Sequence, residues 1–524
     1  MRNGMLGVMV DCSRNAVMNL VTVKKFAQLI KKMGYNTLLL YTEDTYEVDN
    51  QPMFGHLRGK YTKAELKELD NYCVGIGIEL VPCIQTLAHL NSIFKWSQSY
   101  GDINDCDDII LVEEEKTYEL IKDMIRTAAE CFTSRKIHVG MDEAHRVGMG
   151  KYMEKHGIQN RFDIINKHLQ RVCDITYEYG FEPMVWGDMF ENLMLKNKDI
   201  PPEKVKEAAD LPENITLVYW DYYSPNYCDY LGHIERNKLF DTKVCYAGGT
   251  WTWQGFAPRN DFSIITMKAS IAACEDSGVS DMFFTMWGDD GAECSMFAAL
   301  PSLMFAAEKA HGNNDMDSIK AKFKEITGCE FDSFMLFDKF NTFGHEHRDC
   351  ISKAFLYNDV FMGIRNFLCK EGDSEGYRAL ADEIKNICCK GEYKYLFDFY
   401  ESLANVLSLK CSLGIRTRKA YLDNDKTEIR RLADDYSLLI KKLEDFHGIY
   451  QSRWFKENKP HGFDVQDIRI GGLIQRIKSC RDRLLKYLEE GCPIPEIEEP
   501  AMEEINGHNH WSRLVSANVI THML

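Results

Sequence analysis

Long apolar runs are absent from this sequence of 524 residues. Nowhere do about 18 consecutive apolar residues occur, which argues against a membrane-spanning helix. The first residues, MRNGMLGVMVDCS, also lack the basic region, long apolar region and small-residue cleavage site of a secretory signal peptide. Both absences predict a soluble protein that is located in the cytoplasm.

Basic residues are in the minority, with 63 Lys and Arg against 80 Asp and Glu and a net charge of −17. This balance argues against nucleic acid or an anionic membrane surface as the main partner, and a neutral or cationic ligand is easier to accept. Hydrophobic residues make up 45% of the chain, which is enough for a packed core. Because the length exceeds the size of a single core, we expect a large domain and a smaller one.

The 18 cysteines lack the spacing of a disulfide framework or a zinc site. They are scattered, and several lie within apolar runs, for example Cys83, Cys245 and Cys274. We therefore interpret them as buried, reduced thiols. The histidine motifs at 345–347 (HEH) and 508–510 (HNH) have no third ligand at a suitable spacing. We predict neither a metal nor a cofactor.

Eight short aliphatic runs recur along the first 312 residues. They cover residues 5–11, 36–44, 78–85, 136–143, 183–188, 216–221, 243–249 and 281–290. The segments between them, such as 23–34, 63–77 and 115–132, have the three-to-four spacing of amphipathic helices. Near-continuous apolar strands that alternate with helices predict a parallel sheet covered on its outer face. Eight such units predict an α/β fold, a (β/α)₈ TIM barrel, over residues 1–312.

The strand pattern stops after residue 312, and long charged amphipathic segments follow, for example 427–455 and 472–491. They predict a C-terminal, mostly α-helical domain over residues 313–524, with an irregular tail from about residue 491. No linker rich in Gly and Ser separates the two parts, so we expect the helical domain to dock on the barrel.

Acidic and aromatic residues gather where the predicted strands end. They are Asp11, Glu43, Asp44, Asp142, Glu143, Trp186, Asp188, Trp220, Asp221, Tyr246, Trp287, Asp289 and Asp290. In a (β/α)₈ barrel these ends share one rim, where catalytic residues lie. Aromatic faces beside carboxylates are typical of sugar sites, because sugar C–H groups stack on rings and hydroxyls bond to acids.

The segment 136–145, KIHVGMDEAH, places Asp142 and Glu143 side by side at a strand end. Side chains alternate along a strand, so both acids can face one site only where the strand breaks into a loop. Such a pair can act in catalysis, with one acid raising the pKa of the other. The alternative is that the acids cap the following helix. The similar bias at the other strand ends favours catalysis.

His138, Gly140, Asp142 and Glu143 form the pattern His-x-Gly-x-Asp-Glu, and here the chain resembles glycoside hydrolase family 20, the β-N-acetylhexosaminidases. The similarity is to the intracellular bacterial type without an N-terminal domain. It implies exo-acting removal of terminal β-linked GlcNAc or GalNAc with retention, in which the substrate's own acetamido group attacks the anomeric carbon. By resemblance, Asp142 orients the acetamido N–H, and Glu143 is the general acid and then the base.

The same resemblance implies further site residues. His89 and Asp44 would tune Glu143 through a hydrogen-bonded chain, and Tyr246, or else Tyr222, would hold the acetamido oxygen. Asp289 would bind sugar hydroxyls. The substrate-binding residues would also include His138 and an aromatic box of Trp186, Trp220, Trp253 and Trp287. Taken alone, His89 and the tryptophans would be interpreted as core residues.

Departures from the family pattern concern the sugar hydroxyls. Leu6 stands where the family has an arginine, and Asp289 is shorter than the family's glutamate. We therefore expect both N-acetylhexosaminides to be hydrolysed with similar specificity constants. Leu87 and Ala88 replace the Pro and Gly that usually precede the histidine.

Other functions stay open. One is a non-catalytic sugar-binding barrel, and another is a related glycosidase that releases disaccharides, such as a lacto-N-biosidase. A metal-dependent barrel hydrolase is disfavoured, because no His-x-His follows the first strand. We expect an oligosaccharide or glycoside as substrate, and the helical segments are candidate surfaces for a homodimer.

Overall fold

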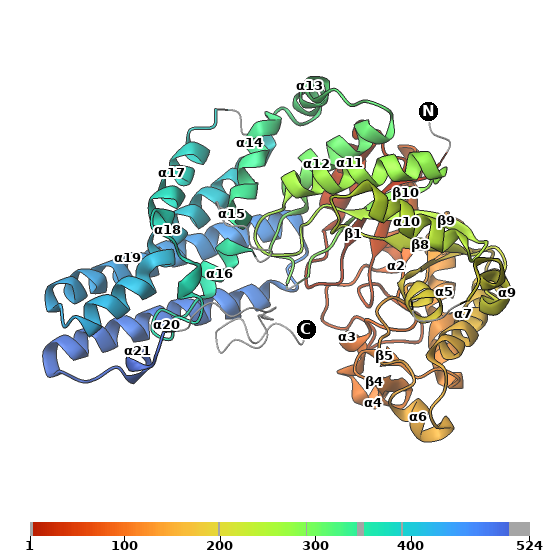
Figure 1. Ribbon diagram of the computed structural model, residues 1–524, viewed down its shortest axis with the longest axis horizontal. Coiled ribbons are helices and arrows are strands. Elements are labelled where there is room, and N and C mark those ends of the chain that lie inside the picture. Colours follow the sequence, from red (N-terminus) through yellow and green to blue (C-terminus); the bar gives the residue numbers. More distant parts are fainter. Residues whose placement is uncertain (1–3, 197–199, 290, 343–349, 389–390, 502–524) are drawn as a thin grey trace.

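In the computed structural model of this protein, the described residues are 4–196, 200–289, 291–342, 350–388 and 391–501. They form a barrel and an elongated helical part beside it (Figure 1). Both histidine motifs, Asp290 and the tail beyond residue 501 lie outside the described residues.

The eight predicted runs form the parallel strands of a closed barrel. The strands are β1 (Leu6–Asp11), β2 (Thr37–Tyr41), β3 (Glu79–Cys83), β6 (Lys136–His138), β7 (Glu182–Trp186), β8 (Thr216–Trp220), β9 (Lys243–Gly249) and β10 (Met282–Met286). β1 closes the barrel, because Val8 pairs with Leu38 of β2 and with Phe284 of β10. The predicted (β/α)₈ fold is confirmed.

Side chains of the strands alternate between two buried environments. One set fills the barrel interior, including Met9, Leu39, Val81 and Phe283. The residues between them, such as Val8 and Leu38, pack against the surrounding helices. Burial on both faces explains why the runs are almost continuously apolar. Tyr41 and Trp186 belong to the interior set and end their strands, so they lie at the catalytic rim of the barrel.

Helices connect the strands and surround the barrel (Figure 1). The longer ones are α1 (Leu20–Met33), α2 (Lys63–Gly75), α5 (Glu115–Cys131), α7 (Arg161–Glu178), α10 (Tyr227–Lys238), α11 (Asn260–Ser277) and α12 (Leu300–Ala310). Short helices lie in the loops: α3 (Asn91–Phe94), α4 (Ser97–Tyr100), α6 (Lys151–His156), α8 (Asp188–Phe190) and α9 (Val205–Ala209). The hairpin β4 (Asn104–Cys106) and β5 (Ile109–Ile110) is not predicted, because its strands are too short to show a period of two.

The chain after the barrel is mostly helical, as predicted. Its helices are α13 (Met316–Thr327), α14 (Phe331–Met335), α15 (Lys339–Thr342), α16 (Ile351–Tyr357), α17 (Asp373–Lys385), α18 (Lys394–Leu422), α19 (Lys426–Glu457), α20 (Phe463–Glu490) and α21 (Pro495–Glu498). The three long helices α18 to α20 follow one another through short turns and pack side by side (Figure 1).

The helical part holds two loops at the catalytic rim of the barrel. The turn between α19 and α20 docks on the loop after β1, where Lys459 N donates to Val17 O at 2.8 Å. Gly462 in this turn has a φ of +88°, and a Cβ there would meet Asn15 O at 2.2 Å, so the close approach requires glycine.

The loop after β10 is held by a buried ion cluster. Glu293 lies 2.9 Å from Lys353 Nζ and 2.5 Å from Arg469 Nη1, and all three side chains are buried. Removing one partner from such a cluster leaves a buried charge uncompensated, so the contact fixes the loop strongly.

Candidate active site

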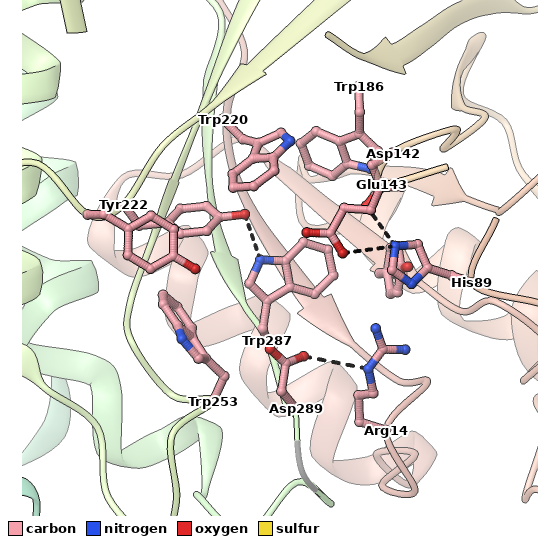
Figure 2. Close-up of a pocket in the computed structure, with 12 residues that line it drawn as sticks. Arg14, His89, Asp142, Glu143, Trp186, Trp220, Tyr222, Trp253, Trp287 and Asp289 are labelled. Atoms are coloured by element: carbon pink, nitrogen blue, oxygen red, sulfur yellow. Dashed lines mark hydrogen bonds and ion pairs between the residues drawn. The ribbon is translucent and has the colours of Figure 1, made fainter. Parts of the chain in front are cut away.

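A cavity of about 90 Å³ opens at the carboxyl ends of the barrel strands (Figure 2). Its lining consists of Arg14, Tyr41, His89, Asp142, Glu143, Trp186, Trp220, Tyr222, Tyr223, Trp253, Trp287 and Asp289. The structure therefore brings together eight of the predicted site residues from six different strand ends. They are His89, Asp142, Glu143, Trp186, Trp220, Trp253, Trp287 and Asp289.

The acid pair lies in a tight turn directly after β6. The strand ends at His138, and Gly140, Met141 and Glu143 have φ values of +76°, +75° and +53°. This turn breaks the alternation of the strand, so the two adjacent acids both line the cavity, as the sequence requires. Left-handed φ values at non-glycine residues are strained and persist only where the surroundings hold them.

Asp142 and Glu143 have different environments. Asp142 is buried, with Oδ2 3.2 Å from His89 Nε2, whereas the Glu143 side chain is 51% exposed, with Oε2 3.6 Å from the same nitrogen. Burial raises the pKa of Asp142, but the charge and hydrogen bond of His89, and a hydrogen bond from Gln85, outweigh it and lower that pKa. Asp142 is thus a fixed anion, and Glu143 lies beside it within reach of solvent.

His89 is a cation between the two acids. Burial lowers its pKa, but the neighbouring Asp142 outweighs this effect by charge and hydrogen bond, and the pKa rises to about 10. The backbone N–H of His89 donates to Asp108 Oδ2 at 3.1 Å, which helps to hold the residue at a φ of +57°. At neutral pH the imidazolium therefore stabilises negative charge at this end of the cavity.

Asp188 contacts the same turn from the start of α8. Its Oδ2 accepts a hydrogen bond from Glu143 N at 3.1 Å. Burial and the nearby Asp142 raise the pKa of Asp188 to about 7. This carboxyl group therefore titrates close to neutral pH, next to the backbone of Glu143.

Aromatic rings form the walls of the cavity (Figure 2). Trp287 Nε1 donates to Tyr222 OH at 3.0 Å, and Trp220 stacks on Tyr222 with ring centroids 5.3 Å apart. The ring centroid of Trp253 lies 5.2 Å from that of Tyr222. Rings in fixed positions around a small cavity can bind the C–H faces of a sugar and the methyl of an acetamido group.

Arg14 and Asp289 form the charged end of the cavity. Arg14 Nε lies 3.5 Å from Asp289 Oδ1, and Nη1 pairs with Glu43. Burial lowers the pKa of Arg14, but Glu43 and other neighbours outweigh it, so the guanidinium stays charged. The sequence comparison placed the family's arginine position at Leu6, where this chain has none, and did not identify Arg14, which lies in the loop after β1. The polar segment after Asp11, CSRN, was the signal in the sequence.

Three predicted residues lie outside the cavity lining: Asp44, His138 and Tyr246. Asp44 was expected to act on Glu143 together with His89. It is buried, and its Oδ1 lies 3.3 Å from Arg58 Nε, whereas the side chain of His89 contacts the acid pair. Arg58 also donates to the carbonyl of Ser13. Asp44 thus holds the loops after β1 and β2 together.

His138 is the last residue of β6, and its ring packs against that of Trp186, with ring centroids 4.4 Å apart. Its Nδ1 accepts a hydrogen bond from Gly140 N at 3.1 Å, and burial lowers its pKa to about 3. The neutral ring supports the turn and the floor of the cavity.

Tyr246 also lies outside the cavity lining. Cys245 and Ala247 face the barrel interior, so Tyr246 faces the helices, and its OH donates to the carbonyl of Asp221 at 2.9 Å. Tyr222, the competing tyrosine, does line the cavity.

Comparison with known proteins gives two family matches. The family model described as "Glycosyl hydrolase family 20, catalytic domain" matches residues 6–233. The family model described as "Glycoside Hydrolase 20C C-terminal domain" matches residues 332–513. Hexosaminidase D of Bos taurus is 24% identical over 331 residues, which are 57% of this chain and 90% of that protein. Hexosaminidase D of Homo sapiens is 23% identical over 203 residues, which are 37% of this chain and only 40% of that protein.

The solved structures that are similar to part of the chain include two bacterial enzymes. The family 20 β-N-acetylhexosaminidase of Streptomyces coelicolor A3(2) has 17% identity and a TM-score of 0.45, covering 63% of this chain and 69% of that one. The β-N-acetylhexosaminidase of Bacteroides fragilis NCTC 9343 has 18% identity and a TM-score of 0.47, covering 62% and 70%.

Proposed function

Because this chain belongs to glycoside hydrolase family 20 and is therefore a glycoside hydrolase, we propose that it is an exo-acting β-N-acetylhexosaminidase. Its substrates would be oligosaccharides or glycosides with a terminal, non-reducing β-linked GlcNAc or GalNAc. The observation that carries this proposal is the acid pair in the cavity: Asp142 is a buried anion, and Glu143 lies beside it within reach of solvent.

The proposed chemistry is substrate-assisted and retaining. The carbonyl oxygen of the substrate's 2-acetamido group attacks the anomeric carbon while Glu143 gives a proton to the departing oxygen. This step breaks the glycosidic bond and leaves an oxazolinium ring. Glu143 then takes a proton from water, which attacks the anomeric carbon from the face that the leaving group left. The bond from that carbon to the acetamido oxygen breaks, the acetamido group is restored, and the configuration is retained.

Asp142 would accept the acetamido N–H and balance the positive charge that develops on the ring. Its low pKa supports this role, because only the ionised carboxylate can do both. Tyr222, whose OH lies among the wall aromatics, would hold the acetamido oxygen in place of Tyr246. Trp186, Trp220 and Trp287 would enclose the acetamido methyl and the sugar ring.

Arg14 and Asp289 would bind the hydroxyl groups of the terminal sugar. A guanidinium and a carboxylate side by side offer donors and acceptors to adjacent hydroxyls. The charged pair at one end and the small volume of the cavity support binding of a single terminal sugar, and hence exo-action.

The expectation of similar specificity constants for GlcNAc and GalNAc rested on a missing arginine and on the short side chain of Asp289. Arg14 supplies a guanidinium beside Asp289, so the first of these two reasons no longer holds. GlcNAc and GalNAc differ at the C4 hydroxyl, and a charged donor can distinguish them. The preference between them depends on which hydroxyl Arg14 and Asp289 reach.

A sugar-binding barrel without catalysis is the alternative. A binding protein could use the same aromatic walls, but it has no need of an acid next to Asp142 that reaches solvent. The position of Glu143 therefore favours an enzyme.

A cytoplasmic location is part of the proposal, supported by the described cysteines, all of which are free thiols and most of which are buried. Pairing of two copies also stays a prediction. In the described part of the chain, no helix has the length and apolar character needed to cross a membrane.

The deciding experiment compares an aryl 2-acetamido-2-deoxy-β-glucoside with the matching aryl β-glucoside. We expect hydrolysis of the first and essentially none of the second, because the second has no internal nucleophile. Comparable kcat/KM values on both would refute substrate assistance. The Asp142→Asn variant should lose activity on the acetamido substrate, while Asp102→Asn, the same change in an exposed ion pair with Lys116, should keep it.

Exo-action and retention need a separate measurement. Proton NMR of the reaction should show the β-anomer of the free monosaccharide first. With a trisaccharide of β-linked GlcNAc, the monosaccharide and the disaccharide should appear together. Early release of a disaccharide from longer chains, without the monosaccharide, would instead indicate a disaccharide-releasing enzyme.

A further inference from the structure

Gln85 is a fully buried amide two residues after β3, and its side chain bonds to the turn that carries the acid pair and to Tyr41. Its Nε2 donates to Asp142 Oδ1 at 2.7 Å and to Tyr41 OH at 2.8 Å. Its Oε1 accepts a hydrogen bond from Met141 N at 3.1 Å. A Cβ at Gly140 would lie 2.0 Å from this oxygen, so the turn is shaped around Gln85.

These partners fix the direction of the amide. Met141 N–H can only donate, so it must face Oε1, and the NH₂ group must then face Asp142. Asp142 Oδ1 consequently has to accept, which an ionised carboxylate always does. Gln85 therefore favours the ionised form of Asp142 and fixes the plane of its carboxylate.

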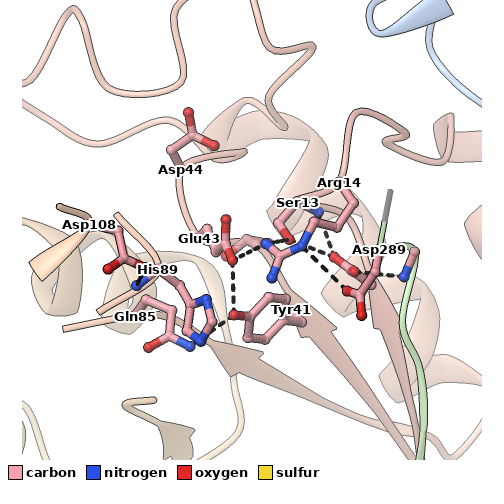
Figure 3. A network of polar contacts seen from close by, with 12 residues as sticks. Ser13, Arg14, Tyr41, Glu43, Asp44, Gln85, His89, Asp108 and Asp289 are labelled. Carbon is pink, nitrogen blue, oxygen red and sulfur yellow. Dashed lines mark hydrogen bonds and ion pairs between the residues drawn. The ribbon is translucent and has the colours of Figure 1, made fainter. Parts of the chain in front are cut away.

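The contacts continue from Gln85 to the other end of the cavity (Figure 3). Tyr41 OH accepts from Gln85 and donates a hydrogen bond to Glu43 Oε1 at 3.0 Å. Glu43 pairs with Arg14, whose Nε lies 3.5 Å from Asp289. Burial raises the pKa of Tyr41 well above 10, so the phenol keeps this proton at working pH.

Each hydrogen bond in the series from Asp142 through Gln85 and Tyr41 to Glu43 has a fixed donor and a fixed acceptor. The NH₂ group of Gln85 has two hydrogens to give, and it serves Asp142 and Tyr41 together. A glutamate of the same shape would have no hydrogen for either partner when ionised, and only one when protonated. The position thus requires an amide.

We propose that Gln85 is a positioning residue that holds Asp142 for the reaction and, through Tyr41 and Glu43, ties its placement to that of Arg14. The proposal rests on the function proposed above and adds a residue that touches no substrate. Gln85 would thereby keep a fixed separation between Asp142, which orients the acetamido N–H, and Arg14, which binds hydroxyls. Positioning of the transition state requires such a fixed separation.

The test is the variant Gln85→Glu, measured as the ratio of wild-type to variant kcat/KM on the aryl acetamido substrate between pH 5 and pH 8. At pH 8 the introduced carboxyl group is ionised and faces Asp142, and we expect a ratio on the order of 100. At pH 5 the introduced carboxyl group can hold a proton and donate it to Asp142, so the ratio should shrink to about 10 or less. A residue with a purely structural role would give the same ratio at every pH.

Gln51→Glu is the matched control, because Gln51 Nε2 donates to Asp123 Oδ2 at 3.0 Å outside the cavity lining. It makes the same amide-to-acid change beside an aspartate, and its ratio should stay near 1 at both pH values. A pH-independent ratio for Gln85→Glu, or one within about twofold of the control, would overturn the proposal.

Tyr41→Phe tests the tie to Arg14 and does not depend on the folding of the Gln85 variant. It keeps the ring that packs edge-on against Trp287 at 4.7 Å but removes the hydroxyl. Loss of a hydrogen bond to a charged group should lower kcat/KM roughly tenfold. An unchanged kcat/KM would overturn the link from Gln85 to Arg14.

Binding of N-acetylglucosamine, measured by calorimetry at pH 5 and pH 8, separates this proposal from the proposed hydrolysis. Wild-type binding that weakens in Gln85→Glu mainly at pH 8, without any hydrolysis, would support the role of Gln85 and refute the hydrolase. Hydrolysis by the wild type with equal weakening at both pH values would refute the role of Gln85 alone.

Discussion

Replacing Asp142 by Asn should turn His89 from a permanent cation into a neutral ring at pH 7. The His89 side chain is only 16% exposed, and Asp142 Oδ2 lies 3.2 Å from its Nε2. Asn keeps the shape of the side chain but removes its charge. The burial that lowers the pKa of His89 would then meet little opposition, because Glu143 is farther away at 3.6 Å and reaches solvent.

The size of the effect follows from the pKa values. A rise from the ordinary value of 6.5 to about 10 corresponds to roughly 5 kcal/mol in favour of the charged ring. Since Asp142 supplies the main opposition to burial, we expect the pKa of His89 to fall below about 7 in Asp142→Asn. A raised histidine pKa stabilises the fold fully below pH 6.5, and this stabilisation is lost as the pH rises toward 10.

The assay is an NMR titration of the Cε1–H groups in protein with ¹³C-labelled histidine. The chain has 15 histidines, so His89→Gln is needed to identify the signal of His89. Asp108→Asn is the control, because Asp108 accepts from the backbone N–H of His89 and not from its ring. In that variant the pKa of His89 should hardly change.

Two results would refute the reasoning. A wild-type His89 that titrates near 6.5 would mean that the ion pair with Asp142 does not form. A pKa that stays near 10 in Asp142→Asn would mean that other groups hold the charge. The melting temperature gives a second readout, since the difference between wild type and His89→Gln should shrink from pH 7 to pH 10.

Three further predictions concern other parts of the chain. Glu143→Gln should lower kcat by about 10²- to 10⁴-fold on a disaccharide but much less on an aryl glycoside with a good leaving group, and equal losses on both would contradict its role as general acid. Glu293→Gln should lower the melting temperature in calorimetry by several degrees, because a buried pair is worth about 3 to 5 kcal/mol when one partner is lost, while Glu68→Gln, in an exposed pair with Lys24, should cost at most about 1 kcal/mol. The pKa of Asp188, about 7, is raised, so the folded state holds this proton longer and loses stability as the pH rises from 5 to 8. The melting temperature of Asp188→Asn relative to wild type should therefore increase over that range, and a constant difference would contradict the shift.

The barrel could be predicted because its signal is local. Each strand is buried on both faces, inside by the barrel core and outside by helices, so a short apolar run marks it whatever the rest of the chain does. The rim residues could be predicted for the same reason, since parallel strands all present their carboxyl ends on one side. Asp142, Glu143 and His89 therefore meet in the cavity although His89 follows a different strand.

The alternation of side chains along a strand also predicts the orientation of Tyr246, although the family resemblance assigned this residue to the site. Tyr246 lies inside β9, three residues before its end at Gly249, between two residues that face the barrel interior. A period of two places it on the outer face, away from the cavity. Tyr222 lies in the loop after β8, where no period applies, and only the folded chain shows that it lines the cavity.

The sequence by itself determined the strands, the helices and the rim on which the acids and tryptophans lie. Only the tertiary structure decided the polar partners: that Asp44 pairs with Arg58, that Arg14 reaches Asp289, and that Gln85 joins Asp142 to Tyr41. The physical reason is the range of the forces involved. Burial of apolar side chains leaves a periodic pattern along a few residues, whereas a hydrogen bond or ion pair depends on how loops far apart in the chain approach within about 3 Å.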